Sequence, residues 1–483
     1  MMKGYGRGTA GIGLSMAVFL VAAFSADRCP GATNLSDSFL LSTNAPWGPQ
    51  YYPDTAYASN GAVWLAVWHQ GIPTGDGTGM AAQDIYAARI RSDGTVLDPA
   101  GIAICANTDF QTRPHVAADG NGFLVVWQDL RSGSSWDVYA ARITTNGIVQ
   151  DPGGFVISGA AGTNECLPDV AFGGGNYCVA WLDARHYPEY RVYGARVTPA
   201  GTIIDTGGTE LIRTISNADR AAWATKPLAP GKLGSGWYEV ARQPCAPTVE
   251  SDGIEFFVTS YASVYGHGGA SLESKMKYYY CTLDGASGLI TRPATNYPKL
   301  ESGITSPTAG NQDNPHARLQ HAAIDTNRFL SAVFYSDAGF GGAGPGSWYT
   351  ALFSPGSTNS QVREIYYDSV QSAVGYRTSG RSPNGVGMAW DGRRGLFVCD
   401  RFLHKTATAP GATRTGDIDI MGTVIENPDG SGTNATVLAI ANGLNTEANA
   451  AVSAGPVGRF LVLWQEQRDV TNSWIAGRFV DVE

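Results

Sequence analysis

Residues 114–131, PHVAADGNGFLVVWQDLR, and residues 137–143, DVYAARI, decide the fold of this chain. They contain a short piece after Pro114, a glycine-rich turn at residues 119–122, and an apolar run that ends at Trp127. After a gap, a third segment alternates apolar and small residues up to Arg142. Short apolar runs separated by turn residues are typical of β-strands. The stretch therefore predicts three consecutive strands.

The same order of features recurs along the chain. Three other clear copies contain Trp68, Trp181 and Trp464, and three weaker copies lie between the third and the last. A brief apolar stretch such as residues 155–157 follows the third segment and predicts a fourth strand. Self-similarity at a regular spacing indicates a repeat architecture. The sequence predicts seven four-stranded units that begin near residues 53, 114, 168, 247, 315, 383 and 446.

The two ends of the repeat region complement each other. The last copy stops after its third strand, whereas residues 39–42, FLLS, precede Pro53 as a fourth strand precedes the next unit. An N-terminal strand that completes the last unit would close a ring and remove exposed sheet edges. We therefore predict an all-β fold, a closed seven-bladed β-propeller that occupies residues 27–483 as a single domain.

The repeated motif also carries a family resemblance. The pattern Pro-x-Val-Ala, Val-Val-Trp-x-Asp-x-Arg and Asp-Ile-Tyr-x-x-Arg resembles the repeats of exported bacterial β-propeller proteins. It is more distantly similar to the propeller repeats of the Tol system. The resemblance covers nearly the whole region after residue 26, with four well-matched copies. It implies a fold and no particular activity.

The first 26 residues have the features of a signal peptide. Lys3 and Arg7 precede a mostly apolar segment at residues 12–24, and small residues at Ala23 and Ser25 suit cleavage. The apolar run is too short for a confident membrane span. We expect export to the periplasm, the cell surface or the medium, with no stable membrane insertion after cleavage.

The composition restricts the classes of partner. The chain has 483 residues, 43% hydrophobic and 16% charged, which describes a globular protein. Its formal net charge of −9 would repel a polyanion. We therefore expect no nucleic-acid partner and favour a glycan or a protein as the ligand.

Almost all of the long connections are predicted on one face. The first-to-second and third-to-fourth turns are short, and both sets share one face of a propeller. The longer segments join second to third strands or lead into the next unit, on the opposite, upper face: residues 69–83, 214–244, 262–274, 338–347 and 355–381. Because scaffolds place recognition on loops, the upper face is the predicted binding face.

Titratable residues follow the leading proline of several repeats. These positions should lie near the mouth of the central channel, and they are Asp54, His115, Asp169 and His316. Imidazoles and carboxylates of this kind could serve as acid and base groups or hold a divalent cation. The alternative is a polar channel mouth whose side chains are only solvated.

Residues that depart from the repeat are the other candidates. Predicted ligand-binding positions are His69, Trp223, Trp237, Tyr238, His267 and Trp348. Exposed aromatic rings beside polar groups suit carbohydrates, although such rings could also pin their own loops. The repeated pairs Asp129/Arg131 and Asp183/Arg185 are predicted to form structural bridges between neighbouring blades.

Three classes of function remain open from the sequence. The first is an exported propeller that binds a glycan or a protein through its upper face. The second is a polysaccharide-active enzyme, a lyase or a glycoside hydrolase, that uses the channel-mouth residues. The third is a structural protein of a surface or matrix. We prefer binding, because the repeats in the middle of the chain are degenerate. Catalytic motifs such as GxSxG and HExxH do not occur in the sequence.

Overall fold

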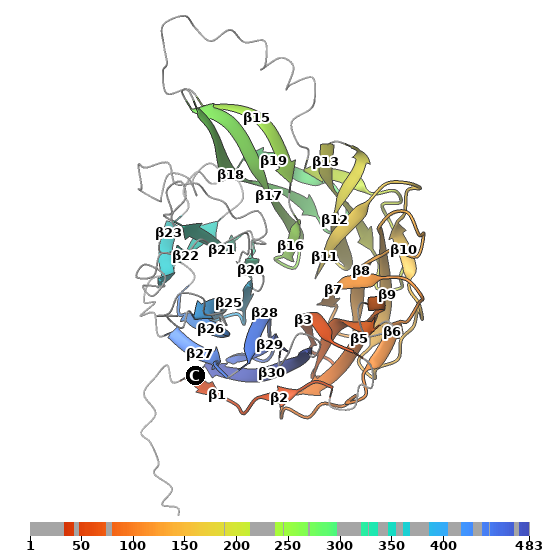
Figure 1. Cartoon of the computed structure of the whole chain (residues 1–483), viewed down its shortest axis with the longest axis vertical. Coiled ribbons are helices and arrows are strands. Elements are labelled where there is room, and N and C mark those ends of the chain that lie inside the picture. Colours follow the sequence, from red (N-terminus) through yellow and green to blue (C-terminus); the bar gives the residue numbers. More distant parts are fainter. Residues whose placement is uncertain are drawn as a thin grey trace, which may run out of the picture.

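The chain forms a ring of β-sheets around a central axis (Figure 1). The computed structural model describes residues 33–42, 48–73, 80–187, 189–212, 237–244, 246–268, 271–296, 320–326, 328–336, 346–353, 361–367, 386–403, 417–427, 437–443, 445–467 and 473–482. Within these residues there are seven antiparallel sheets, five with four strands and two with five. The predicted all-β propeller fold is therefore confirmed.

The first three blades have regular four-stranded order, from the innermost strand outward. Blade 1 contains β3 (Gln50–Ala58), β4 (Val63–Pro73), β5 (Met80–Arg91) and β6 (Ile102–Cys105). Blade 2 contains β7 (Gln111–Ala118), β8 (Gly122–Asp129), β9 (Asp137–Thr144) and β10 (Phe155–Ser158). Blade 3 contains β11 (Glu165–Gly173), β12 (Asn176–His186), β13 (Glu189–Val197) and β14 (Thr209–Ile212).

The next three blades come from the weaker repeats. Blade 4 contains β15 (Trp237–Pro244), β16 (Thr248–Ser251), β17 (Glu255–Gly268), β18 (Ser271–Asp284) and β19 (Ile290–Asn296). Blade 5 contains β20 (Gln320–Asp325), β21 (Arg328–Ser336), β22 (Gly346–Phe353) and β23 (Gln361–Tyr367). Blade 6 contains β24 (Val386–Trp390), β25 (Gly395–Leu403), β26 (Asp417–Ile425) and β27 (Val437–Ala441).

The last blade joins both ends of the described chain. Its inner strands are β28 (Thr446–Ala454), β29 (Arg459–Gln467) and β30 (Ser473–Val482). On the outer side, β1 (Thr33–Leu35) and β2 (Phe39–Leu40) both pair antiparallel with β30. The predicted completion of the last blade by residues 39–42 is confirmed, and β1 adds a second segment to the same edge.

The innermost strands connect the blades into a closed ring. Each inner strand contacts the next around the axis, in the order β3, β7, β11, β16, β20, β24 and β28, and β28 contacts β3 again. The side chain of Gln50 strengthens this last joint, because its Oε1 accepts a hydrogen bond of 2.9 Å from the backbone N–H of Ile475. The first blade is therefore attached directly to the last.

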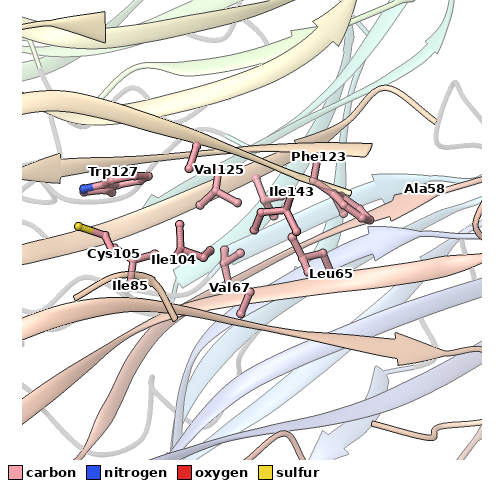
Figure 2. Close-up of a cluster of buried hydrophobic side chains, with 14 of the residues drawn as sticks. Ala58, Leu65, Val67, Ile85, Ile104, Cys105, Phe123, Val125, Trp127 and Ile143 are labelled. Atoms are coloured by element: carbon pink, nitrogen blue, oxygen red, sulfur yellow. The ribbon is translucent and has the colours of Figure 1, made fainter. Parts of the chain in front are cut away.

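Apolar side chains fill the space between blades. Figure 2 shows the cluster between blades 1 and 2, in which Leu65, Val67 and Ile85 meet Val125 and Trp127. All five are completely buried. Strands that pack sheets on both faces need apolar side chains on both faces, which explains the near-continuous apolar run before each tryptophan. The core therefore consists of layers between blades.

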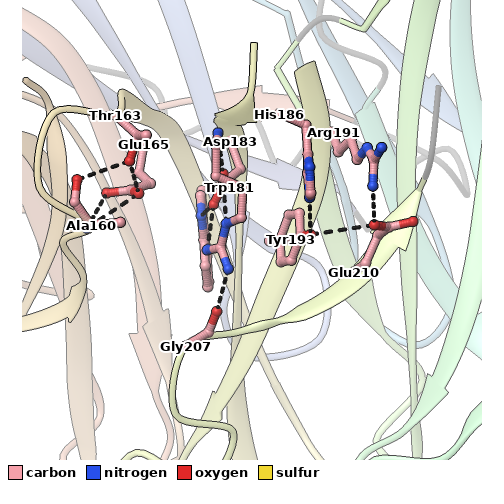
Figure 3. A network of polar contacts seen from close by, with 11 residues as sticks. Ala160, Thr163, Glu165, Trp181, Asp183, His186, Arg191, Tyr193, Gly207 and Glu210 are labelled. Atoms are coloured by element: carbon pink, nitrogen blue, oxygen red, sulfur yellow. Dashed lines mark hydrogen bonds and ion pairs between the residues drawn. The ribbon is translucent and has the colours of Figure 1, made fainter. Parts of the chain in front are cut away.

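The repeated Trp-x-Asp-x-Arg motif acts within one blade. In blade 3, Trp181 Nε1 donates to Asp183 Oδ2 at 2.9 Å, and the Arg185 guanidinium pairs with the same carboxylate at 2.6 Å (Figure 3). Arg185 also lies over the Tyr193 ring, 4.0 Å from its centroid. The expectation that these Asp/Arg pairs bridge neighbouring blades is wrong, because the aspartate and the arginine of each pair belong to the same blade.

Arginines of the third strands make the contacts between blades instead. Arg142 pairs with Asp151 of its own blade at 2.7 Å, and its Nη1 donates to the carbonyl of Ala200 in blade 3 at 2.6 Å. Arg196 repeats this arrangement with Asp205 and with Ala286 of blade 4. The fixed fork of the guanidinium suits this double role, because it bonds a carboxylate and a carbonyl together.

All five segments predicted as upper-face connections contain strand residues. The segment 69–83 includes the end of β4 and the start of β5, and 338–347 includes the start of β22. Residues 262–274 belong largely to β17 and β18, which pair in continuous register from Glu255–Asp284 to Gly268–Ser271. The segment 214–244 contains β15, which pairs with the outer end of β17, and 355–381 contains β23. In Figure 1 the long green strands of blade 4 project beyond the ring. Unbroken ladder pairing explains these extensions, since it satisfies backbone groups that a loop would leave to water.

Candidate functional site

A β-bulge recurs near the start of four innermost strands. At each bulge the strand register shifts, and the residue at the shift has a left-handed backbone. These residues are Tyr52 (φ 51°), Arg113 (φ 54°), Leu167 (φ 54°) and Asn449 (φ 57°). A positive φ is uncommon for residues other than glycine, and bulges re-aim the side chains around them. Because the bulge recurs in four blades, it is a regular feature of the structural repeat.

Side chains of the preceding blade hold three of these bulges. The backbone N–H of Leu167 donates to Gln128 Oε1 at 3.0 Å, and that of Asn449 donates to Asp400 Oδ2 at 3.1 Å. The N–H of Arg113 lies 3.4 Å from His69 Nδ1, which accepts the hydrogen bond. Each bond satisfies a backbone donor that the register shift removes from the sheet ladder. In blades 1 and 2 the residue after the motif tryptophan thus holds the next blade, and in blade 6 Asp400, which follows Cys399, does the same.

His69 serves this inter-blade role and is enclosed by it. Its side chain is only 3% exposed, and its ring stacks on Tyr52 with 5.4 Å between centroids. Burial and the neighbouring charge of Arg113 lower the pKa of His69 to about 3. Arg113 in turn lies 4.7 Å above the Tyr52 ring centroid. Ligand contact at His69, as the sequence predicts, would require these neighbours to move.

Three predicted site residues come together, each two positions after the left-handed residue of the bulge in blade 1, 2 or 3. His115 Nδ1 lies 3.2 Å from Asp54 Oδ2 and 3.5 Å from Asp169 Oδ1. The three residues belong to β3, β7 and β11, so one imidazole connects three blades. A carboxylate only accepts hydrogen bonds, so His115 must carry a proton on Nδ1 to bond either of them. We call Asp54, His115 and Asp169 the rim triad.

The two carboxylates of the rim triad also bind the backbone of the following blade. Asp54 Oδ2 accepts from the N–H of Val116, and Asp169 Oδ2 accepts from the N–H of Val249, both at 3.0 Å. Both carboxylates remain partly exposed, as does His115: the side-chain exposed fractions are 23% for Asp54 and His115 and 16% for Asp169. The rim triad therefore combines fixed positions with access from outside.

The rim triad places hydrogen-bonding groups of both kinds beside aromatic rings. Tyr51, Tyr52 and Arg113 lie just before it on the same inner strands and are also partly exposed. Within the described residues, no group of three or more His, Cys, Asp and Glu side chains is arranged to hold a metal ion. The arrangement suits a ligand rich in hydroxyl groups, which donate to carboxylates and accept from guanidinium and imidazole.

The remaining predicted site residues lie in blades 4 and 5 or outside the described residues. Trp223 and His316 lie outside the described residues. In blade 4, β15 and β17 place Tyr238 opposite His267, and Trp237 opposite Gly268. Trp348 lies on β22, opposite Phe334 and Tyr366. The strand register thus brings Tyr238 and His267 together but leaves Trp348 in the neighbouring blade.

Tyr52 and Arg113 are site residues that the sequence analysis missed. Each occupies the position directly before the leading proline of its repeat, Pro53 or Pro114. This position varies between the repeats, whereas the proline recurs. The variation was the signal in the sequence that marks this position as separate from the structural repeat. The bulge hid it, because a regular strand would alternate its side chains without a left-handed residue.

No protein-family model and no curated protein sequence matches the chain. Solved structures are similar over most of its length at low sequence identity. A protein of unknown function from Dyadobacter fermentans has 10% identity and a TM-score of 0.45, over 93% of this chain and 99% of its own. The GH93 α-L-arabinofuranosidase of Fusarium graminearum, solved with arabinobiose, has 11% identity and a TM-score of 0.41, over 92% and 97%. Polysaccharide lyase Uly1 has 8% identity and a TM-score of 0.40, over 89% and 76%.

Within the described residues, no helix is long and apolar enough to cross a membrane.

Proposed function

We propose that this chain is an exported glycan-binding propeller whose ligand contacts the rim triad on the inner strands of blades 1–3. The observation that carries the proposal is the position of His115, within 3.2 Å of Asp54 and 3.5 Å of Asp169, with all three side chains partly exposed. Export is supported by the signal-peptide features of residues 1–26.

The charges of the rim favour an uncharged glycan. Asp54 and Asp169 contribute two negative charges, and Arg113 contributes one positive charge at the adjacent bulge. A uronate or a sulfated sugar would meet two carboxylates and the overall negative charge of the protein, which disfavours its approach. Neutral sugar hydroxyls can instead donate to the carboxylates and accept from His115 and Arg113.

A second candidate function is hydrolysis of the bound glycan. Because both carboxylates contact the same nitrogen atom, their contacting oxygens lie less than about 7 Å apart. This upper limit is compatible with the separation of about 5 to 5.5 Å between the two carboxyl groups of retaining glycoside hydrolases. One carboxyl group would protonate the leaving oxygen, and the other would act as nucleophile or activate water. This reading assigns Asp54 and Asp169 to the chemistry and His115 to the fixing of their positions.

The test is a binding screen with product analysis in the same wells. The chain from residue 27 is titrated with a panel of neutral and acidic oligosaccharides, as wild type and as the variants Asp54→Asn, Asp169→Asn and His115→Gln. Asp93→Asn is the matched control, because this carboxylate lies in a turn between β5 and β6, where it accepts from Thr95 N–H. We expect a neutral glycan to bind wild type and Asp93→Asn, and to bind the rim variants about tenfold more weakly.

The outcomes separate the two functions. Product that disappears in Asp54→Asn and Asp169→Asn, with binding retained, would establish hydrolysis. Binding without product in any variant would establish a lectin-like role. Equal binding by all four variants, or binding of acidic glycans alone, would refute the assignment of the rim triad as a neutral-glycan site. Thermal unfolding of each variant shows whether a loss of binding reflects a loss of folding.

A further inference from the structure

Blade 1 lacks the Asp/Arg pair that completes the tryptophan motif in blades 2 and 3. Strand register aligns Gln70 with Asp129 and Asp183, because Gln70 pairs with Asp84 as Asp129 pairs with Asp137 and Asp183 with Arg191. Ile72 then holds the position of Arg131 and Arg185. As a result, the buried indole Nε1 of Trp68 has no hydrogen-bond partner, whereas Trp127 Nε1 donates to Asp129 at 2.9 Å.

Blade 1 has neither member of this pair, but it has a different carboxylate, Asp84, opposite Gln70. Asp84 is 4% exposed, and its Oδ1 is buried without a hydrogen-bond partner. Its counterpart in blade 2, Asp137, lies within the electrostatic influence of Arg131. A buried polar atom without a partner costs free energy, and a buried charge without a partner costs more.

A cavity of about 610 Å³ lies beside this carboxylate, at the joint between blades 1 and 2. Its wall includes Ile72 and Asp84 from blade 1, Asp109 before blade 2, and Arg131 at the end of β8. Arg131 is already neutralised by Asp129, which it contacts at 2.6 Å. Asp84 and Asp109 therefore give the cavity a negative charge. Blade 1 has the uncharged Ile72 where blades 2 and 3 have an arginine, so it supplies no positive charge there.

We propose that this cavity binds the guanidinium group of a small organic cation, seated against Asp84 where blades 2 and 3 place their own arginine. The repeat itself supplies the template, because the guanidinium of Arg131 pairs with a carboxylate and lies 3.9 Å above the Tyr139 ring centroid. Blade 1 keeps the aromatic position as Tyr86, which stacks on Trp68 with 6.3 Å between centroids. Gln70 and Ile72 replace the aspartate and the arginine of the pair. The site lies apart from the rim triad, so it is independent of the proposed glycan site.

Binding is expected to strengthen from pH 5 to pH 7.5. Burial raises the pKa of Asp84 to about 6, so the carboxylate that attracts the cation is largely neutral at pH 5. The other charged or titratable groups that face it are Asp109, the Asp129–Arg131 pair, Tyr86 and Cys105. Burial raises the pKa values of Tyr86 and Cys105, to about 11 for Cys105, so neither gains charge in this range.

The test compares methylguanidinium with methylurea, which has a similar shape and no charge. Calorimetric titration at constant ionic strength uses the chain from residue 27 as wild type, Asp84→Asn, Ile72→Arg and Asp137→Asn. We expect methylguanidinium to bind wild type and Asp137→Asn equally, and methylurea to bind neither. Affinity should fall about tenfold or more in Asp84→Asn. In Ile72→Arg, the introduced guanidinium should occupy the site and abolish binding.

Stability measurements keep the proposal testable if one variant folds poorly. Ile72→Arg should raise the melting temperature of the ligand-free protein, because it supplies the missing counter-charge to Asp84. Equal binding of methylguanidinium by wild type and Asp84→Asn would overturn the proposal. So would an Asp84-dependent stabilisation by CaCl₂ without any effect of methylguanidinium, which would identify the ligand as a metal ion.

Discussion

Individual side chains in the upper part of this propeller respond to pH in opposite directions. Glu165 is completely buried at the start of β11, where it accepts hydrogen bonds from Thr163 Oγ1 at 2.9 Å and from Ala160 N–H. Burial nevertheless dominates and raises its pKa to about 7. His69 is buried as a neutral imidazole, and its pKa is lowered to about 3. Lowering the pH therefore removes the cost of burying a charged Glu165, whereas protonation of His69 would place a charge in a buried site.

At this scale we predict that Glu165→Gln stabilises the protein at pH 8. A carboxylate whose folded pKa lies above its unfolded value of 4.5 loses stability as the pH rises from about 4.5 to 7. Glutamine removes that loss, which we expect to be about 2 kcal/mol at pH 8 and near zero at pH 4.5. Gln50 and Gln111 hold the same position in blades 1 and 2, so the repeat tolerates the amide.

Urea unfolding of wild type and Glu165→Gln between pH 4.5 and pH 8 checks this. The two curves of unfolding free energy against pH should diverge as the pH rises. Parallel curves would show that burial of Glu165 has no net cost.

At the scale of the element, blades 2 and 3 each depend on a glycine that lets the outer turn approach the tryptophan. Gly153 and Gly154 precede β10, and both have a φ of 78°. A Cβ on Gly154 would collide with the Trp127 ring, whereas a Cβ on Gly153 would meet no atom within 4 Å. Gly208 lies equally close to Trp181 in blade 3. The tryptophan therefore packs against backbone, and only glycine permits the contact.

This pair of neighbouring glycines gives a prediction with a built-in control. Gly153→Ala should cost about 1 kcal/mol, because it introduces only the left-handed backbone penalty. Gly154→Ala should cost about 3 kcal/mol or more, since it adds an overpacked contact with Trp127. Chemical unfolding of both variants measures the difference. Equal destabilisation would mean that the turn can move away from the ring without cost.

At the scale of the whole molecule, the ring depends on residues that are far apart in the chain. Strand β2 pairs with β30 near Gly477, and Phe39 lies against Phe479 with 6.0 Å between ring centroids. Ser473 Oγ donates to the carbonyl of Gln50 at 2.6 Å, although 423 residues separate them. The N-terminal segment thus covers the outer edge of the last blade, which would otherwise expose unpaired backbone groups.

We predict that Phe39→Ala loosens this closure and promotes self-association. Loss of the ring should lower the unfolding free energy by about 2 kcal/mol, since Phe39 is only partly buried. An exposed edge of β30 should then pair with other molecules. Light scattering at increasing concentration measures the association. Leu35→Ala in β1 is the control, because Leu35 is 37% exposed. Its light scattering should match that of wild type at every concentration. Identical scattering by Phe39→Ala and wild type would refute an edge-protecting role.

The prediction from sequence was good for the architecture and partial for the site. Trp127 and its counterparts revealed the strand order, because burial between sheets imposes an apolar run that local sequence displays. The channel-mouth positions Asp54, His115 and Asp169 were also found from the repeat. Arg113 and Tyr52 were missed, since a bulge changes the direction of side chains without changing the apolar pattern. The β17–β18 extension was missed because its residues, such as Ser263 and Lys277, alternate too weakly to indicate a strand.

The amino-acid sequence by itself determined the number of blades, the order of strands within a blade, and the return of residues 39–42 to the last blade. The first two features follow from periodic burial, which residues close together in the chain display. The third follows from the need to pair the sheet edge of a last repeat that lacks its fourth strand. Only the tertiary structure decided that His115 contacts two carboxylates, although 61 residues separate it from Asp54. It also decided that a cavity lies beside Asp84 in blade 1, where Ile72 holds the position of the arginine of blades 2 and 3. Such contacts depend on how neighbouring blades pack against each other, and patterns among residues close together in the chain do not encode this packing.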